Sequence, residues 1–273
     1  MKIFIFGSNG MAGNYIKNYL SSSSYSYTII PITRKDYDLE YLTIDSLTQL
    51  LIGKDLEKGD IIINCAGVIP QSGAQRNLNT RKYFTINSIF PIVLSMICNN
   101  FEANLIHITT DCVYSGKDGN YDENSEPDET SDYGLSKSLG DLSRCTIIRT
   151  SIIGEELVNK RSLVEWVKSN RNGEINGYMD HYWNGITCLQ LAKIIYQIIT
   201  KNMYWEGIRH IFSPRSVSKY ELLCIINREY DLNIKVNKFS TDQLNKTINT
   251  IHEILFDIPD LIIQINNMKK FYN

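Results

Sequence analysis

A glycine-rich turn directly behind the first apolar segment constrains the fold of this chain most. Residues 3–6 are apolar, and the sequence GSNGMAG at residues 7–13 follows them at once and opens a helical pattern over residues 11–20. In such a strand-turn-helix, the first glycine permits the tight turn, the second lets the backbone approach a pyrophosphate, and the third allows close packing of helix on strand. The N–H groups at the helix start can then bind phosphate. An ordinary glycine turn is the alternative. The residues predicted to contact a dinucleotide here are Gly7, Asn9, Gly10 and Met11.

Apolar strand patterns alternate with helical patterns through the first 155 residues. This alternation predicts an α/β fold of the Rossmann type, with a doubly wound parallel sheet that helices cover on both faces and that binds ligands at its carboxyl edge. A smaller α/β unit is predicted for residues 156–273, with some elements returning to the sheet. The predicted strands are residues 3–6, 27–33, 60–64, 105–108, 145–149, 209–213 and 234–239. The main predicted helices are residues 11–20, 81–100, 161–170, 189–201, 219–230 and 251–271.

Two further segments complete the predicted cofactor site. The second strand runs into Arg34 and Lys35, where a site for NAD would place a carboxylate for the ribose hydroxyls. Two cations there favour a 2′-phosphate, so we predict NADPH as the cofactor, with NADH as the alternative. A solvated loop with stray basic residues is the competing interpretation. At the end of the third strand, Cys65, Ala66 and Gly67 are small enough to leave the adenosine path open.

The segment from Ile106 to Gly140 carries the residues with catalytic chemistry. An apolar strand ends near Thr110, and after an acidic loop a helix begins in which Tyr133 and Lys137 stand four residues apart. This spacing puts both side chains on one helix face, so a phenol, an ammonium and a hydroxyl can converge. The spacing alone is weak evidence, because about one Tyr-xxx-Lys is expected by chance in a chain with 17 tyrosines. The strand before it and the glycine turn upstream make it a candidate site.

These three side chains suit the reduction of a ketone. Hydride delivery leaves negative charge on oxygen, and in a poorly solvated site a proton must arrive as that charge develops. Tyr133 is the natural proton donor. We expect Lys137, together with an oxidised nicotinamide, to bring the pKa of the phenol from near 10 toward neutrality. Thr110 would fix the carbonyl by a hydrogen bond.

Composition argues against several other classes of protein. The net charge of -2 and the pI near 6.1 give no overall reason to bind nucleic acid or an anionic membrane. The six cysteines have no CxxC spacing, so we expect reduced thiols and no metal site. We find no room for a signal peptide before the glycine turn and no apolar run of membrane-spanning length, and we predict a cytoplasmic protein.

Five motifs occur in the order found in extended short-chain dehydrogenases/reductases. They are the glycine turn, Asn64-Cys-Ala-Gly67, Thr109-Thr-Asp-Cys-Val-Tyr114, Tyr133-Gly-Leu-Ser-Lys137 and Arg149-Thr-Ser151. Within that superfamily the chain resembles the dTDP-4-dehydrorhamnose reductase type of sugar-nucleotide reductase over roughly residues 1–230. The acidic segment Asp122-Glu-Asn-Ser-Glu-Pro127 adds to the resemblance.

The resemblance implies an NADP-dependent oxidoreductase that reduces carbon 4 of a nucleotide-linked 4-keto-6-deoxyhexose for deoxysugar biosynthesis. It makes Thr110, Tyr133 and Lys137 the catalytic triad, and Tyr133 and Lys137 cofactor contacts as well. It places the substrate between the sheet and a C-terminal substrate-binding domain, near Trp183 and Asn184. The Arg-Pro motif of that family is replaced by KTINT at residues 246–250. This replacement leaves the nucleotide and the sugar open, and a UDP-linked 2-acetamido-2,6-dideoxyhexulose is one candidate.

Two alternatives remain at this stage. Cys112 stands where the similar GDP-fucose synthase carries a catalytic cysteine, so the chain could be a combined 3,5-epimerase and 4-reductase; a packing role is the simpler interpretation. The beta subunit of methionine adenosyltransferase also resembles this subfamily, so a non-catalytic regulatory subunit is the alternative of another class. We expect the apolar C-terminal helix to pack on its own chain, with a homodimer face as the alternative.

Overall fold

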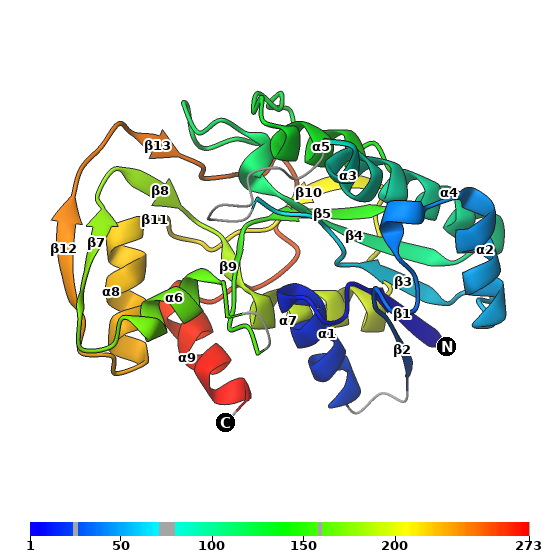
Figure 1. The fold of residues 1–273 in the computed structure, drawn as a ribbon, viewed down its shortest axis with the longest axis horizontal. Coiled ribbons are helices and arrows are strands. Elements are labelled where there is room, and N and C mark those ends of the chain that lie inside the picture. Colours follow the sequence, from blue (N-terminus) through cyan, green and yellow to red (C-terminus); the bar gives the residue numbers. More distant parts are fainter. Residues whose placement is uncertain (24–26, 71–79, 158–159, 273) are drawn as a thin grey trace.

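A six-stranded parallel sheet forms the centre of the computed structural model, which describes residues 1–23, 27–70, 80–157 and 160–272 (Figure 1). Its strands, in spatial order, are β2 (Thr28–Ile32), β1 (Lys2–Phe6), β3 (Ile61–Asn64), β4 (Asn104–Thr110), β5 (Thr146–Thr150) and β10 (Gly207–His210). All five neighbouring pairs are parallel. This arrangement confirms the predicted α/β sheet.

The alternation of side chains along β1 explains why both faces of the sheet are covered. Ile3 and Ile5 belong to one apolar core, and Phe4 and Phe6 to the other. Because neighbouring residues of a strand point to opposite faces, a continuous apolar run of this kind needs a partner on each side. Helices α1 (Met11–Ser21) and α7 (Cys188–Thr200) cover one face, and α2 (Ile44–Gly53), α3 (Thr80–Phe84), α4 (Phe90–Phe101) and α5 (Asp132–Gly140) lie on the other (Figure 1).

The helix predicted over residues 81–100 is interrupted by a π-helical turn, η2 (Thr85–Ile89), between α3 and α4. Pro91 near the start of α4 has no N–H for the carbonyl of Asn87, four residues earlier. That carbonyl instead faces α5, where a side chain on Gly140 would come within 2.1 Å of it. The whole helix Thr80–Phe101 is long and apolar enough to cross a membrane, but 56% of its most apolar stretch is buried in the fold.

The C-terminal elements gather at one end of the sheet (Figure 1). Two of them, α7 and β10, return to the sheet itself, and the others form small two- and three-stranded sheets with helices against them. The division at residue 155 stays a prediction. The remaining elements are η1 (Leu39–Tyr41), η3 (Asp111–Val113), β6 (Ile152–Ile153), α6 (Leu163–Ser169), β7 (Glu174–Tyr178), β8 (His181–Trp183), β9 (Ile186–Thr187), β11 (Val217–Ser218), α8 (Lys219–Glu229), β12 (Lys235–Phe239), β13 (Leu244–Asn245) and α9 (Leu261–Phe271).

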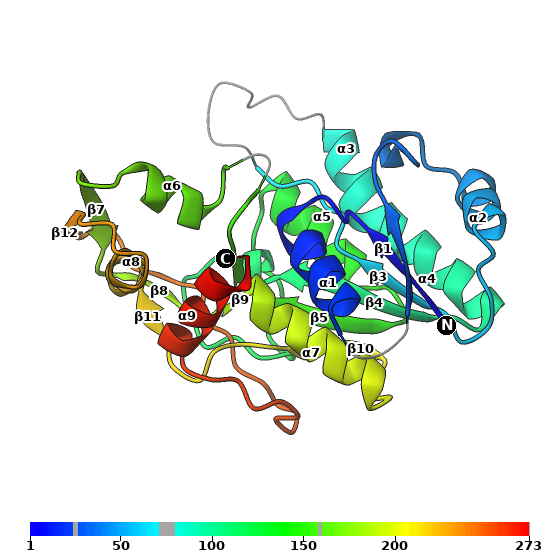
Figure 2. The same cartoon turned by 90° about the horizontal axis from the view of Figure 1, so that it is seen from below.

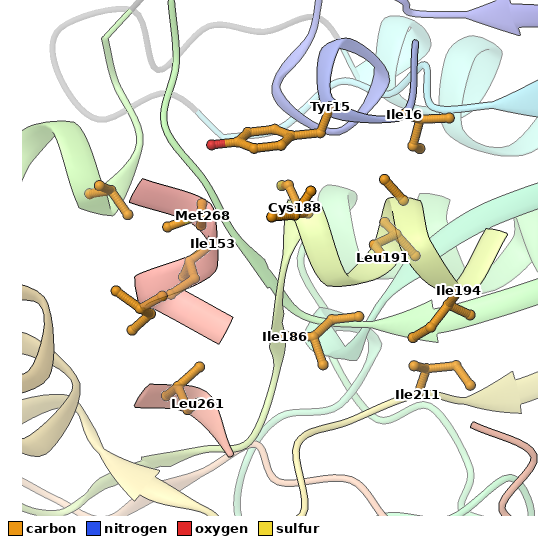
Figure 3. Packing of buried hydrophobic residues seen from close by; sticks show 14 of the residues in the cluster. Tyr15, Ile16, Ile153, Ile186, Cys188, Leu191, Ile194, Ile211, Leu261 and Met268 are labelled. Atoms are coloured by element: carbon orange, nitrogen blue, oxygen red, sulfur yellow. The ribbon is translucent and has the colours of Figure 1, made fainter. Parts of the chain in front are cut away.

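The apolar core that contains Ile3 and Ile5 joins the C-terminal helix α9 to the first helix, α1. Figure 3 shows Tyr15 and Cys188 packed close to Met268 of α9, and Figure 2 shows α9 beside α1 and α7 from below. The Tyr15 ring stacks on Phe271 at 5.6 Å, and the Tyr272 hydroxyl donates to Asn14 at 2.7 Å. The predicted packing of this helix on its own chain is therefore confirmed.

Two elements have other ends in the structure than the sequence predicted. The segment 251–271 becomes helical only at Leu261, because Pro259 disfavours helical backbone at Ile258 and the Asp260 side chain caps the helix by accepting from the Ile262 N–H. The strand predicted to end at residue 213 ends at His210. Strand β7, which pairs with β12, was not predicted.

Candidate active site

The carboxyl ends of β1 and β3 open a pocket at the point where the sheet changes direction. From β1 the chain crosses to β2 on one side, whereas β3 leads to β4 on the other, and such switch points are the usual ligand sites of open α/β sheets. A pocket of about 190 Å³ lies there. Of the residues predicted to hold a cofactor, those that line it are Gly7, Gly10, Arg34, Cys65, Ala66 and Gly67. A smaller hollow shares Gly10 with this pocket and is lined by Asn9 and Met11.

The glycines of the turn are required by close backbone contacts. Gly7 has a φ of +72°, and a Cβ there would lie 2.8 Å from the Ala66 nitrogen. A Cβ on Gly13 would lie 2.3 Å from the Gly7 carbonyl oxygen. Gly10 precedes α1 without a side chain that could cap its first N–H groups. The turn therefore presents bare backbone and a helix N-terminus to the pocket, a combination that suits a pyrophosphate.

The cationic end of β2 faces the same pocket. Arg34 lines it and makes no ion pair with any other residue that the structure describes. Asp36 does not compete for this position, because its carboxylate accepts from the N–H and hydroxyl of Thr33 at 2.9 and 2.8 Å. These bonds lower the pKa of the Asp36 carboxyl. The geometry thus leaves a free guanidinium where the ribose of a dinucleotide would lie.

Residues just beyond Arg34 also line the pocket and were not predicted. Tyr37, Asp38 and Leu39 form part of its wall, and the Asp38 carboxylate accepts the Glu40 N–H at 3.1 Å as the cap of η1. The sequence carried one signal for them, an acidic turn directly after the basic pair. The pocket wall therefore holds a carboxylate as well as a guanidinium.

Thr110 and Tyr133 meet at the carboxyl end of β4. Thr110 caps η3 by accepting the Cys112 N–H at 3.1 Å, and its hydroxyl donates to Asp111 Oδ1 at 3.2 Å. It lies near enough to the Tyr133 phenol to lower the pKa of that group. Ser131 caps α5 by accepting from Gly134, which fixes Tyr133 in the first turn. The two predicted hydroxyl groups therefore lie close together at this edge of the sheet.

The protein groups around Tyr133 raise its pKa above the usual value of 10; the expected fall toward neutrality, which also depends on an oxidised nicotinamide, stays a prediction. Burial is the largest cause, and the Cys112 thiol and the Asp111 carboxyl add to it, while Thr110 opposes it. The Tyr83 ring packs edge-on against the phenol at 6.3 Å and adds to the burial. The phenol therefore holds its proton firmly, as a proton donor must before the reaction.

Lys137 lies beneath the end of β3, with only 6% of its surface exposed. Its Nζ lies 3.0 Å from the place that a Cβ on Gly67 would occupy, so only glycine fits there without displacing the ammonium. Burial lowers the pKa of Lys137, and the Asp141 carboxylate opposes this shift. One helix face thus carries Tyr133 toward Thr110 and Lys137 toward the cofactor pocket.

Asn87 has a structural role. Its amide accepts the Val68 N–H at 2.9 Å and donates to the Val68 carbonyl at 3.0 Å and to Ser136 at 3.1 Å. The π-helical turn therefore ties the segment after β3 to the catalytic helix.

Cys112 lies near the phenol as a protonated thiol. Its Sγ is 3.6 Å from Asp111 Oδ1, and burial followed by the Asp111 charge raises the pKa of the thiol to about 12. A thiol of this kind can donate a proton but does not readily remove one. The epimerase alternative therefore needs a separate base.

The aromatic segment before α7, residues 181–185, contains strand β8, and its Trp183 and Asn184 are buried. Trp183 is 3% exposed, and the Lys219 ammonium lies 5.1 Å from the centre of its ring. The Asn184 amide donates to the Ile248 carbonyl at 2.8 Å and accepts the Ile248 N–H at 3.0 Å. These contacts occupy the two side chains that we expected near the substrate.

One family model and several curated proteins are similar to this chain. The family model for the RmlD substrate binding domain matches residues 1–250. The probable low-salt glycan biosynthesis reductase Agl14 of Haloferax volcanii is 28% identical over 145 residues, which is 52% of this chain and 48% of that protein. This match spans only about half the length of that relative. The spore coat polysaccharide biosynthesis protein SpsK of Bacillus subtilis is 24% identical over 93% of this chain and 88% of its own.

A solved structure shares the fold over nearly the whole chain. The dTDP-4-dehydrorhamnose reductase of Bacillus anthracis, determined in complex with NADP, has a TM-score of 0.80 and covers 98% of each chain at 22% identity. At that identity the likeness establishes the fold alone.

Proposed function

Since the chain belongs to the RmlD substrate binding domain family, we propose that it is an NADPH-dependent reductase of a sugar nucleotide. Its substrate is a nucleotide-linked 4-keto-6-deoxyhexose, and the ketone at carbon 4 is reduced to the alcohol. The reaction belongs to the synthesis of deoxysugar precursors of glycans.

One observation carries this proposal above the others: the Thr110–Tyr133 hydroxyl pair and the Lys137 ammonium converge on the edge of the sheet that holds the glycine turn. NADPH, when bound, supplies the hydride. The bare backbone of the turn fits its pyrophosphate, and Arg34 fits its 2′-phosphate. Thr110 orients the ketone oxygen, and Tyr133 delivers a proton to that oxygen as negative charge develops on it. Lys137 holds the nicotinamide ribose and adds positive charge near the reacting oxygen.

A panel of 4-keto-6-deoxy sugars linked to dTDP, UDP or GDP tests the function. We expect NADPH, followed by its absorbance, to be oxidised with at least one of them. The panel also separates sugars with a hydroxyl at carbon 2 from acetamido sugars. If the protein binds NADPH but oxidises it with none of these ketones, the reductase proposal fails and the regulatory-subunit alternative gains support.

Arg34→Ala tests whether the Arg34 guanidinium binds the 2′-phosphate of NADPH. Removing a guanidinium from a phosphate forfeits a charge-assisted bond of about 1.5–3 kcal/mol, so we expect NADPH affinity to fall by roughly 10- to 100-fold. NADH affinity should change by less than about threefold, since NADH lacks the phosphate. Lys35→Ala is the matched control, because Lys35 is the adjacent cation and does not line the pocket. Equal losses for both nucleotides in Arg34→Ala would contradict the assignment. Isothermal titration measures all four affinities.

A further inference from the structure

A buried ion pair lies directly behind the catalytic lysine. Tyr133, Lys137 and Asp141 follow one another at intervals of four residues, and the Asp141 N–H donates to the Lys137 carbonyl at 3.3 Å, so the helical turn continues to Asp141. The Asp141 Oδ2 atom accepts from Arg149 Nη2 at 2.7 Å, and the two side chains are 3% and 2% exposed. No part of the reduction described above uses this pair.

The sheet fixes Arg149 in place. Thr109 of β4, Arg149 of β5 and His210 of β10 are register partners, so they form one row across three strands. Arg149 Nη1 donates to the Tyr114 hydroxyl at 2.6 Å and to His210 Nε2 at 3.2 Å. The Arg149 guanidinium cannot move without losing its hydrogen bonds to Tyr114, His210 and Asp141.

His210 contributes no charge to the cluster. Its Nδ1 lies 2.7 Å from the Asn249 carbonyl oxygen and therefore donates, which leaves Nε2 as an acceptor for Arg149. Burial, followed by the charge of Arg149, lowers the pKa of His210 to about 4. Asp141 is consequently the counter-ion of Arg149 among the described residues.

Asp141 favours the charged form of Lys137 through space, since the two residues lie one helical turn apart and their side chains form no ion pair among the described residues. The other titratable groups that face the ammonium are neutral near pH 7: burial raises the pKa of the Cys65 and Cys112 thiols to about 12 and lowers that of His107 to about 3. Burial raises the pKa of Asp141 itself, but Arg149 at 2.7 Å and Lys137 both favour its anion. The Asp141 Oδ1 atom lies near the Thr109 hydroxyl but forms no well-formed hydrogen bond with it. Arg149 is therefore the hydrogen-bond donor to this carboxylate among the described side chains.

We propose that Asp141, held by Arg149 one helical turn beyond Lys137, is a positioning residue that keeps the Lys137 side chain as an ammonium for the nicotinamide ribose. The proposal rests on the proposed reductase, in which Lys137 binds the nicotinamide ribose. Without the carboxylate, burial alone acts on the ammonium, and Lys137 loses its proton at a lower pH.

Asp141→Asn tests this role because it removes the charge and keeps the shape. NADPH affinity and kcat are measured from about pH 6 to pH 10, a range that spans the titration of a lysine with a lowered pKa. We expect the alkaline limb of both profiles to move to lower pH by about one unit or more, which is a tenfold loss at the pH of the wild-type limb. Asp141→Glu, which keeps a carboxylate but displaces it by one methylene, should move the limb in the same direction by a smaller amount.

Asp60→Asn is the matched control. Asp60 is also buried, and its carboxylate accepts backbone N–H groups of Lys2 and Glu57 at the amino end of the sheet, far from the site. It should lower the melting temperature without moving the limb. An alkaline limb that stays in place in folded Asp141→Asn overturns the proposal. If Asp141→Asn does not fold, Asp141→Glu provides the test. An alkaline limb at the wild-type pH in both profiles of Asp141→Glu also overturns the proposal, because its carboxylate is displaced. NADPH affinity remains measurable even if no ketone is reduced, so failure of the reductase proposal is distinguishable.

Discussion

Replacing Tyr133 by phenylalanine should lower kcat by roughly 10²- to 10⁴-fold, the usual contribution of a positioned proton donor. The phenol lies beside Thr110 and can release a proton to the ketone oxygen, and phenylalanine keeps the ring against Tyr83. NADPH affinity should stay within about threefold of wild type, because the Lys137 contact survives. Stopped-flow absorbance of the nicotinamide with saturating ketone measures the change.

Tyr19→Phe is the matched control for this substitution. Tyr19 is also a half-buried tyrosine with an edge-on aromatic neighbour, Tyr196 at 5.7 Å, and it lies on α1 away from the triad. Its turnover should remain that of wild type. If Tyr133→Phe reduced the ketone at an undiminished rate, proton donation by this phenol would be excluded, and the proposed mechanism with it.

Local sequence patterns predicted the sheet and the place of the triad. The apolar runs of β1 and β3 are fully buried and end in small residues, so their strand character and their shared edge follow from residue type alone. The four-residue spacing of Tyr133 and Lys137 fixes their common face in any helix. The assignment of these residues to catalysis and to the cofactor stays a prediction that the variants above test.

Features that depend on distant partners could not be predicted. The environment that raises the pKa of Tyr133 comes from Tyr83, Asp111 and Cys112, which belong to two other elements. Asn184 is held by Ile248, 64 residues away. The row that holds Arg149 exists only because β10 returns to pair with β5. Each of these contacts can be predicted only when the order of the strands in the sheet is known. The alternation of strands and helices along the sequence does not specify that order.

Gly13→Ala should lower both the stability of the fold and its affinity for NADPH. The added Cβ would lie 2.3 Å from the Gly7 carbonyl oxygen and 2.9 Å from Ser8 Cα, and both neighbours are backbone atoms of the turn itself. Since no flexible side chain can yield, α1 must move away from the turn, at a cost of about 1–3 kcal/mol for overpacking. The movement displaces the helix N-terminus from the pyrophosphate site, so NADPH affinity should fall by at least about tenfold, or 1.4 kcal/mol. Urea unfolding and isothermal titration measure the two effects.

Gly53→Ala provides the comparison, because it makes the same change at the end of α2 with no atom within 4 Å of the new Cβ. It should raise the free energy of unfolding by about 0.4–1 kcal/mol, since alanine loses less conformational entropy on folding, and leave NADPH affinity unchanged. The opposite signs of the two stability changes separate steric packing at the turn from the general effect of replacing glycine. If Gly13→Ala instead behaved like Gly53→Ala in both measurements, close contact between helix and turn would not be needed, and the phosphate site would have to lie elsewhere along the sheet edge.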